Sequence, residues 1–214
     1  MGVVVDLLIA TSNPNKLREI RQVLSDAPVT LHSLAELARI EEPDETGATF
    51  AENARLKADY YDAHLRRANV PWAPDALTVA EDSGLVIDAL NGEPGVLSAR
   101  FIRPDASYEE RFAEIERRLA EHPERPRTAR FVCALAAVKA GRMIFDTRGV
   151  VEGTIASTPA GSRGFGYDPI FYFPLYGRTL AEVDEAEKLA VAHRGHAFQA
   201  LATWIRNQSG AAGG

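Results

Sequence analysis

The chain has 214 residues, a formal charge of −6 and a hydrophobic share of 46%. This composition is typical of a globular protein with a sizeable core, and the acidic balance excludes a broad basic surface for nucleic acid. The single cysteine excludes an internal disulfide, and no stretch is apolar enough to span a bilayer. We therefore expect a cytoplasmic protein that binds neither nucleic acid nor a membrane.

The first predicted elements are a strand over residues 3–10 and a helix from about Pro14 to Leu24. Asn13 can cap this helix, and Pro14 fits its first turn. A strand, a polar turn and a helix N-terminus form a natural anion site, because backbone N–H groups and the helix dipole face the ligand. Lys16 adds a full charge and favours this interpretation over an ordinary capped turn.

A long helix is predicted from about Thr49 to Ala68, after a turn that contains Glu45. Thr49 and Glu52 have the spacing of a capping box, which gives the Glu52 carboxylate a local role. Glu45 has no such role and is the better candidate for a metal ligand. Lys57 lies two turns into the helix, where it faces either a cleft or solvent.

Two adjacent carboxylates, Glu81 and Asp82, stand between two apolar runs. Residues 77–80 predict a buried strand, and residues 85–90 predict a second extended run. A charged pair in this place is costly to bury unless it is paired or holds a cation. One interpretation is a catalytic carboxylate at a strand end with Mg²⁺ nearby. The other is a solvated turn, and this stretch alone leaves both open.

The middle of the chain predicts a helix over residues 108–120, capped by Ser107, with its Arg and Glu side chains in solvent. Two long strands follow, over residues 129–139 and 143–155, with a hairpin turn between them. Cys133 lies in an apolar run of the first strand. A buried small hydrophobe is therefore the expected role of this cysteine.

A glycine-rich loop over residues 161–169 carries Phe165 and Tyr167. Glycines let a backbone approach a ligand closely, and an aromatic face is a platform on which a base can stack. The alternative is a structured turn whose aromatic side chains belong to the core. Phe171 and Phe173, just beyond the loop, are expected in the core.

Three cationic or donor residues follow, at Lys188, His193 and Arg194. A short helix is predicted over residues 180–192, and Gly195 then separates it from a last amphipathic helix. Donors beside a glycine hinge suit an anion or a base with a carbonyl group. A triplet of surface side chains is the alternative.

Taken in order, these motifs resemble the inosine triphosphate pyrophosphatase family, whose members hydrolyse non-standard purine nucleoside triphosphates. The resemblance covers nearly the whole chain, from residue 5 to about residue 206. The motifs that carry it are Ala10-Thr11-Ser12-Asn13 with Lys16, Glu45-Thr46-Gly47-Ala48-Thr49-Phe50 with Glu52-Asn53-Ala54 and Lys57, Glu81-Asp82-Ser83-Gly84-Leu85, Pro94-Gly95 with Ser98-Ala99-Arg100, Gly164-Phe165-Gly166-Tyr167-Asp168-Pro169, and Glu187-Lys188 with His193-Arg194-Gly195.

The resemblance implies an α/β fold with a mixed central sheet, flanking helices and two lobes around a substrate cleft. It implies a homodimer that uses Mg²⁺ to convert ITP, dITP or XTP to the monophosphate and pyrophosphate. We accordingly expect one two-lobed domain over residues 1–208, with a disordered tail over residues 209–214.

The resemblance also assigns roles to residues. Asp82 would be the general base and a metal ligand, and Glu45 would be a second metal ligand. The residues implied to hold phosphates are Thr11, Ser12, Asn13, Pro14, Asn15, Lys16 and Lys57. Those implied to line the rest of the substrate site are Ser83, Phe165, Gly166, Tyr167, Asp168, Lys188, His193 and Arg194. Ala192 and Leu97 depart from residues common in the family, which affects fine specificity rather than the proposed catalytic groups.

Two other functions are considered beside this one. Maf-like nucleotide pyrophosphatases share the fold and the phosphate turn, but the Gly-Phe-Gly-Tyr-Asp-Pro loop and the His-Arg pair argue against them. A module that senses nucleotides without hydrolysing them is the second alternative. The presence of both Glu45 and Asp82 argues against it, because a carboxylate beside a metal can orient and deprotonate a water.

Overall fold

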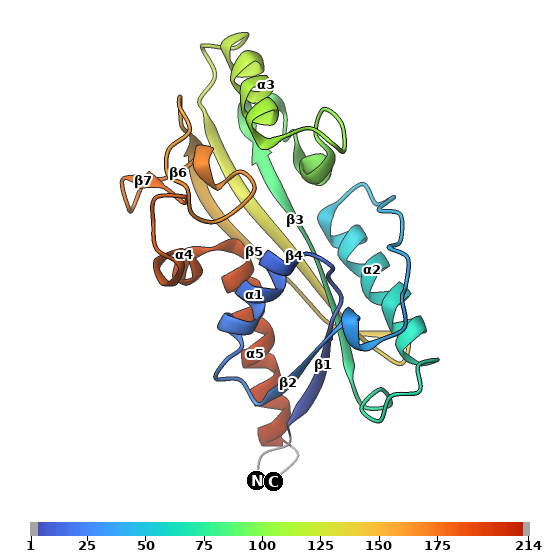
Figure 1. Cartoon of the computed structure of the whole chain (residues 1–214). Coiled ribbons are helices and arrows are strands. Elements are labelled where there is room, and N and C mark those ends of the chain that lie inside the picture. The colour runs from blue at the N-terminus through green and yellow to red at the C-terminus, as the bar shows by residue number, and fades with distance from the viewer. Residues whose placement is uncertain (1–3, 212–214) are drawn as a thin grey trace. The chain divides into compact units, whose positions relative to one another are not determined.

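The computed structural model describes residues 4–211 of the chain. Its strands are β1 (Val5–Ile9), β2 (Val29–Ser33), β3 (Leu77–Ile87), β4 (Thr128–Lys139), β5 (Arg142–Ile155), β6 (Phe171–Phe173) and β7 (Arg178–Thr179). Its α-helices are α1 (Pro14–Val23), α2 (Phe50–Leu65), α3 (Tyr108–Ala120), α4 (Glu185–Val191) and α5 (His193–Ala211) (Figure 1).

The strands form one seven-stranded sheet in the order β2-β1-β3-β4-β5-β6-β7. β1 is parallel to both β2 and β3, whereas β6 is antiparallel to β5 and β7. The sheet is therefore mixed, and the predicted α/β class with a mixed central sheet and flanking helices is confirmed. No helix within residues 4–211 has both the length and the hydropathy that crossing a membrane requires.

The chain divides into two compact units. The first runs up to Asp82 and also contains Cys133–Gly149 and the chain from Arg194 onward, and the second contains Ser83–Val132 and Val150–His193. Strands β3, β4 and β5 each begin in one unit and end in the other. The predicted substrate cleft and the single domain over residues 1–208 stay predictions.

The first unit is a sheet with helices on both faces. Successive side chains of a strand point to opposite faces, so Val79 of β3 packs with α1 and α5 while Ala80 packs with α2. β4 follows the same rule, since Cys133 lies on the α5 side and Ala134 on the α2 side. Cys133 is fully buried, as predicted.

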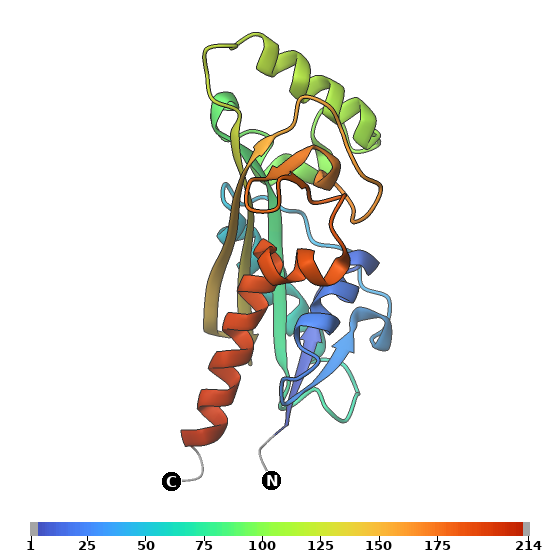
Figure 2. The same cartoon turned by 90° about the vertical axis from the view of Figure 1, so that its left-hand side faces the viewer.

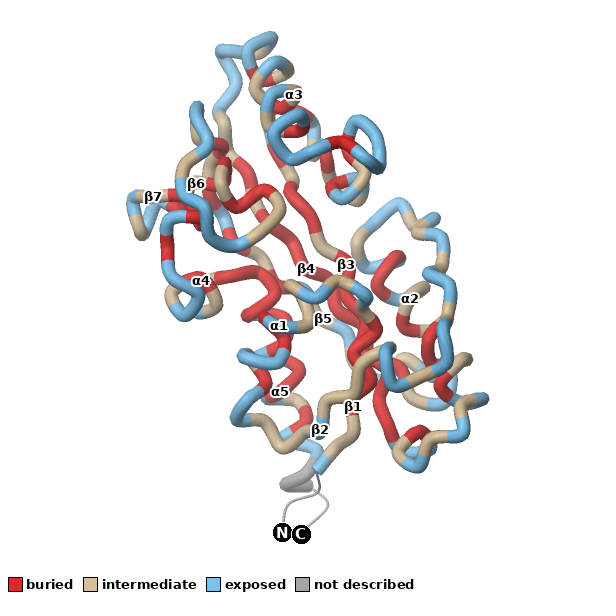
Figure 3. Tube along the Cα trace, in the orientation of Figure 1, coloured by how far each residue is buried: buried red, intermediate tan, exposed pale blue. Residues whose placement is uncertain are grey.

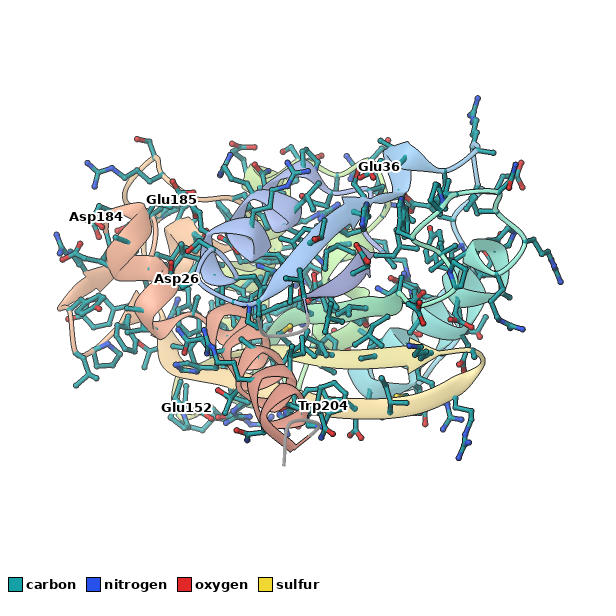
Figure 4. The ribbon with its side chains drawn as sticks, turned by 90° about the horizontal axis from the view of Figure 1, so that it is seen from below. Asp26, Glu36, Glu152, Asp184, Glu185 and Trp204 are labelled. Atoms are coloured by element: carbon teal, nitrogen blue, oxygen red, sulfur yellow. The ribbon has the colours of Figure 1, made fainter. Side chains whose placement is uncertain are left out.

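Helix α5 also packs along the β4–β5 hairpin. Figure 2 shows α5 running beside these two strands, and Figure 4 labels Trp204 on this helix. The rings of Trp204 and of Phe145 on β5 have centroids 5.3 Å apart. The hairpin turn is Ala140-Gly141, and both residues have positive φ, as a two-residue type I′ turn requires. This turn confirms the predicted hairpin.

The second unit packs α3 on the ends of the long strands. Ile115 and Leu119 of α3 share a buried cluster with Leu85, Phe131 and Phe171. The α3 bounds and the Ser107 cap agree with the prediction, and Glu110 completes a capping box. The burial of the phenylalanines at both ends of β6 is confirmed as well.

Several sequence-based expectations were wrong in detail. Residues 77–90 are not two runs around a turn, because β3 continues unbroken through Asp82 and ends at Ile87. The central strands β3 and β4 are buried along almost their whole length (Figure 3). Arg111 of α3 is buried rather than solvated, and it donates to the carbonyls of Ser98 and Pro104.

The C-terminal part also differs from the prediction. The helix expected over residues 180–192 is shortened to α4, because Thr179 belongs to β7 and the Asp184 side chain caps the helix that follows it. Helix α5 continues to Ala211, and the remaining residues of the predicted tail, 212–214, lie outside the described residues.

Candidate active site

One cluster of the first unit is built around the carboxylate of Asp82. Its Oδ1 accepts a hydrogen bond from Lys57 Nζ at 3.1 Å, and its Oδ2 accepts one from Asn53 Nδ2, also at 3.1 Å. Lys57 Nζ also donates to Glu45 Oε1 at 2.7 Å. Asn53 and Lys57 lie four residues apart on α2, so they share the helix face that covers β3. We call Glu45, Asn53, Lys57 and Asp82 the Asp82 cluster.

The loop that carries Glu45 is held by the start of α2. Asn53 Oδ1 accepts the N–H of Gly47 at 2.8 Å, and a Cβ on Gly47 would lie 2.6 Å from that oxygen. Thr49 and Glu52 form the predicted capping box, in which Glu52 Oε2 accepts the Thr49 N–H. Glu52 therefore has the local role that the sequence predicted, and Asn53 joins the loop to Asp82.

The surroundings of Asp82 hold its proton more firmly than water would. Burial raises the pKa of this carboxyl; the Lys57 charge opposes the rise, while Glu45 and Glu81 add to it, and the pKa stays above its usual value of 3.8. For Lys57, burial by itself would lower the pKa. The charges of Asp82, Glu81 and Glu45 outweigh burial, so the pKa is raised and the ammonium stays charged at neutral pH.

The Asp82 cluster fits a magnesium ion that is shared with a ligand. Two carboxylate oxygens, from Glu45 and Asp82, already converge on one cationic atom, Lys57 Nζ. Within residues 4–211 no three His, Cys, Asp or Glu side chains gather as a metal site. Mg²⁺ commonly takes one or two carboxylates and completes its shell with water and substrate phosphates. The two carboxylates match that pattern.

A second cluster of the first unit surrounds Glu81. Its Oε1 lies 2.7 Å from Lys16 Nζ and 3.3 Å from Arg194 Nη2. Arg194 Nη1 donates to Glu19 Oε2 at 2.5 Å, and Cys133 Sγ lies 3.4 Å from Glu81 Oε2. Burial opposes ionisation of Glu81, but Arg194, Lys16 and Lys57 hold its pKa well below the usual value. We call Lys16, Glu19, Glu81 and Arg194 the Glu81 cluster.

The predicted anion turn joins β1 to α1. Asn13 caps α1, and its Oδ1 accepts the N–H groups of Asn15 and Lys16 at 2.9 and 3.2 Å. The Asn13 N–H donates to Thr11 Oγ1. The cap thus engages two N–H groups that the sequence argument offered to a phosphate. At the same turn, Ser12 is exposed and Lys16 is half-buried.

A third cluster lies in the second unit. Asp168 Oδ2 accepts hydrogen bonds from Lys188 Nζ at 2.6 Å and from the Phe165 N–H at 2.8 Å. Lys188 Nζ also sits 4.7 Å from the centroid of the Phe165 ring, in cation–π contact. Gly164 has φ +72°, and a Cβ there would lie 2.1 Å from Asp168 Oδ2. We call Phe165, Asp168 and Lys188 the Phe165 cluster.

The two aromatic residues of the glycine-rich loop have different surroundings. Tyr167 is buried and its hydroxyl donates to the Ser98 carbonyl at 2.8 Å, so its ring belongs to the core. Phe165 and Gly166 are half-buried, and the Phe165 ring carries Lys188. Of the two interpretations of this loop, the core role holds for Tyr167.

The triplet that looked like one donor group in the sequence is divided in the structure. Lys188 pairs with Asp168, and Arg194 donates to Glu81 and Glu19. The His193 ring stacks on Phe131, with centroids 5.0 Å apart. All three side chains are buried, which excludes a surface triplet, and Ser83 on β3 is half-buried.

Sequence reasoning missed two residues of these clusters and the partner of a third. Asn53 was signalled by its spacing of four from Lys57 on a predicted helix. Glu19 had no local signal, because its partner Arg194 is 175 residues away in the chain. Glu81 was recognised as a costly charge, but its partner Arg194 is 113 residues away in the chain, and no local signal connects them.

The comparisons with known proteins identify the family of the chain. The Ham1 family model matches residues 7–204 of the chain. The chain belongs to the Ham1 family. A dITP/XTP pyrophosphatase of an Exiguobacterium species is 44% identical over 195 residues, which cover 91% of this chain and 94% of that protein.

Solved structures of related proteins also resemble this chain. A HAM1 protein from Coxiella burnetii has a TM-score of 0.82 at 35% identity, with 95% of this chain and 99% of that chain covered. A nucleoside-triphosphatase / dITP/XTP pyrophosphatase from Mycobacterium abscessus has a TM-score of 0.69 at 42% identity, covering 92% of this chain and 97% of that chain. The resemblance drawn from the motifs is therefore confirmed.

Proposed function

We propose that this protein hydrolyses the non-standard purine nucleoside triphosphates ITP, dITP and XTP to the monophosphate and pyrophosphate, with Mg²⁺ as cofactor. The observation that carries the proposal is the buried Asp82 carboxylate. Lys57 donates hydrogen bonds both to it and to the Glu45 carboxylate. The substrate class is supported by relatives of the Ham1 family that are named dITP/XTP pyrophosphatase.

Glu45 and Asp82 would hold the magnesium ion, which, when bound, makes a nearby water more acidic and offsets phosphate charge. Asp82 accepts a proton from the attacking water, and the raised pKa of its carboxyl suits a base. The water oxygen bonds to the α-phosphorus, the bond to the bridging oxygen breaks, and pyrophosphate leaves. Asn53 holds the Asp82 carboxylate in one orientation, so the base needs no rearrangement.

The phosphates would be bound by the turn before α1 and by lysines. The turn offers Thr11, Ser12 and Asn13, with Pro14 and Asn15 shaping the start of the helix. Lys16 and Lys57 are both salt-bridged to carboxylates in the structure. A triphosphate would replace these carboxylates as the partner of each lysine. Each carboxylate would still have a cation beside it once the metal is bound.

Recognition of the base would fall to the residues that the family resemblance assigns to it. Phe165 supplies a face for stacking, which accepts any base, so selection must come from polar groups. Lys188, His193 and the loop N–H groups donate to the C6 carbonyl of hypoxanthine or xanthine. Adenine has an amino group there and offers these donors no acceptor at C6. A site of this kind rejects the wrong analogue by ~10⁴-fold.

A pyrophosphate-release assay with Mg²⁺ on ITP, dITP, XTP, GTP and ATP tests the proposal. We expect the first three to be hydrolysed far faster than ATP. Equal efficiency on ATP and ITP would contradict the assignment of the base site. Release only from other nucleotides would favour a Maf-like enzyme, and binding without release would favour a sensing module.

The oligomeric state and location are further parts of the proposal. We propose a homodimer that works in the cytoplasm, on the basis of the family resemblance. Sedimentation equilibrium should give about twice the chain mass of 23.3 kDa. Cell fractionation of the tagged protein checks the location.

A further inference from the structure

The Lys57 ammonium occupies an unusual place for a group that is expected to bind phosphate. It donates to Glu45 Oε1 at 2.7 Å and to Asp82 Oδ1 at 3.1 Å, the two oxygens that would hold the metal. An ammonium has three donors, so two of them are directed at the metal ligands. The three side chains are at most about one-quarter exposed, so solvent screens this ion pair only weakly.

We propose that the Lys57 ammonium takes the place of the divalent cation between Glu45 and Asp82 until metal and triphosphate together displace it. The inference rests on the proposed function and concerns how that site is switched on. Without nucleotide, a divalent ion would have to expel a paired ammonium or share the carboxylates with it. Like charges at that distance repel, so the nucleotide-free protein binds the metal weakly.

The arriving triphosphate removes this obstacle. Its anionic oxygens offer Lys57 a new partner, and the vacated carboxylates then receive the metal. The exchange needs only a movement of the Lys57 side chain, which is long and flexible. The backbone of α2 stays in place, and Asn53 keeps its hydrogen bond to Asp82. Metal and nucleotide thus favour each other's binding, and this coupling is reciprocal. Metal alone displaces Lys57 only at high concentration.

The test is metal binding without nucleotide, measured by electron paramagnetic resonance with Mn²⁺ in place of Mg²⁺. Lys57→Met should tighten Mn²⁺ binding by about tenfold or more. Lys57→Arg keeps the charge and should stay close to wild type. Lys16→Met removes an equal charge that pairs with Glu81 instead, and it should also stay close. Unchanged or weaker Mn²⁺ binding in folded Lys57→Met would overturn the inference, as would equal tightening in Lys16→Met.

A second test uses the wild-type protein, so its result does not depend on whether a variant folds. Trace acetylation, read by peptide mass spectrometry, reports how freely the Lys57 amine reacts. Adding Mg²⁺ to saturation should raise its labelling relative to Lys139, a surface lysine. No rise would overturn the inference. Pyrophosphate release is a separate readout, so normal hydrolysis with unchanged labelling rejects only the exchange, and absent hydrolysis with the expected metal affinities rejects only the proposed function.

Discussion

Glu81 and Asp82 are consecutive residues of one strand, yet their environments are opposite. Glu81 faces α1 and α5, where it meets two cations, and its pKa is held well below the usual value. Asp82 faces α2, where it meets one cation, one amide and the charge of Glu45 nearby, and its pKa is raised. The alternation of a β-strand separates the two carboxylates by a sheet, and the partners on each face decide what each can do.

The Glu81 cluster is a structural counterpart to the Asp82 cluster. Arg194 is nearly inaccessible and directs its guanidinium to Glu81 and Glu19. It joins α5 to Glu19 of α1 and to Glu81 of β3, the residue that also pairs with Lys16. We therefore assign Arg194 a positioning role, in place of the direct contact with the base implied by the family resemblance. The following predictions separate the two clusters, from the largest expected effect to the smallest.

Asp82→Asn should reduce turnover on dITP by ~10²–10⁴-fold, the usual contribution of a general base. The fold should be retained, because Asn is isosteric and still has Asn53 and Lys57 beside it. Pyrophosphate release and circular dichroism measure the two outcomes. Near-normal hydrolysis by the folded variant would show that the base is another group.

Arg194→Met should lower the free energy of unfolding by ~3–5 kcal/mol, because it leaves two buried carboxylates with one cation fewer. Arg55→Met is the matched control, since Arg55 is 63% exposed and pairs with Asp59 on the surface of α2. That pair should contribute at most about 1 kcal/mol. Urea titrations compare the variants, and similar losses in both would refute the structural role of Arg194.

The opposite pKa shifts predict opposite effects on stability in buffer containing EDTA. Ionised Glu81 stabilises the fold above its usual pKa of 4.5, and this contribution is lost as the pH falls through its lower folded value. Asp82 behaves in the reverse way, because its stability contribution is complete below pH 3.8 and is lost as the pH rises through its raised folded value.

Glu81→Gln should therefore destabilise the protein at pH 7, and Asp82→Asn should stabilise it. The Asp82→Asn difference should shrink as the pH falls through the raised folded pKa of Asp82 toward 3.8. The Glu81→Gln difference should shrink only as the pH falls below 4.5 toward the lowered folded pKa of Glu81, as long as the proteins still fold. Urea titrations at pH 7 and at decreasing pH measure the trend. The same sign for both variants at pH 7 would contradict the contrast between the two faces of β3.

The smallest effects should separate Glu45 from Glu52. Glu45→Gln should raise the Mg²⁺ concentration needed for activity, since it removes one of the two carboxylates proposed to hold the metal. Glu52→Gln should leave this requirement unchanged and lower stability by about 1 kcal/mol through the weakened capping box. Mg²⁺ titrations and melting curves distinguish them, and the reverse pattern would refute both assignments.

Local signals in the sequence determined the features whose partners lie within a few residues. The Asn13 cap, the Thr49–Glu52 capping box and the Ser107 cap all depend on contacts across two or three residues, and all three appear as predicted. The hairpin turn is equally local. Such contacts repeat because helix and turn geometry fixes the distance between near neighbours in the chain.

Other elements were missed because their signals are weak or non-local. β2 was not recognised, and β6 and β7 have only three and two residues, too short for a periodic pattern. The unbroken course of β3 through two carboxylates depends on cations that reach it from other elements. From the sequence, a solvated turn was as plausible as a buried carboxylate, since Ser and Gly are common in turns.

The sequence by itself determined the family, the order of its motifs and the residue types that the chemistry needs. Only the tertiary structure decided which carboxylate meets which cation. Lys57 reaches Asp82 across 25 residues, and Arg194 reaches Glu19 across 175. Sheet topology sets such pairings, because it determines which helix covers each face of a strand. Desolvation and the neighbouring charges then shift the pKa of one carboxyl down and that of the next one up.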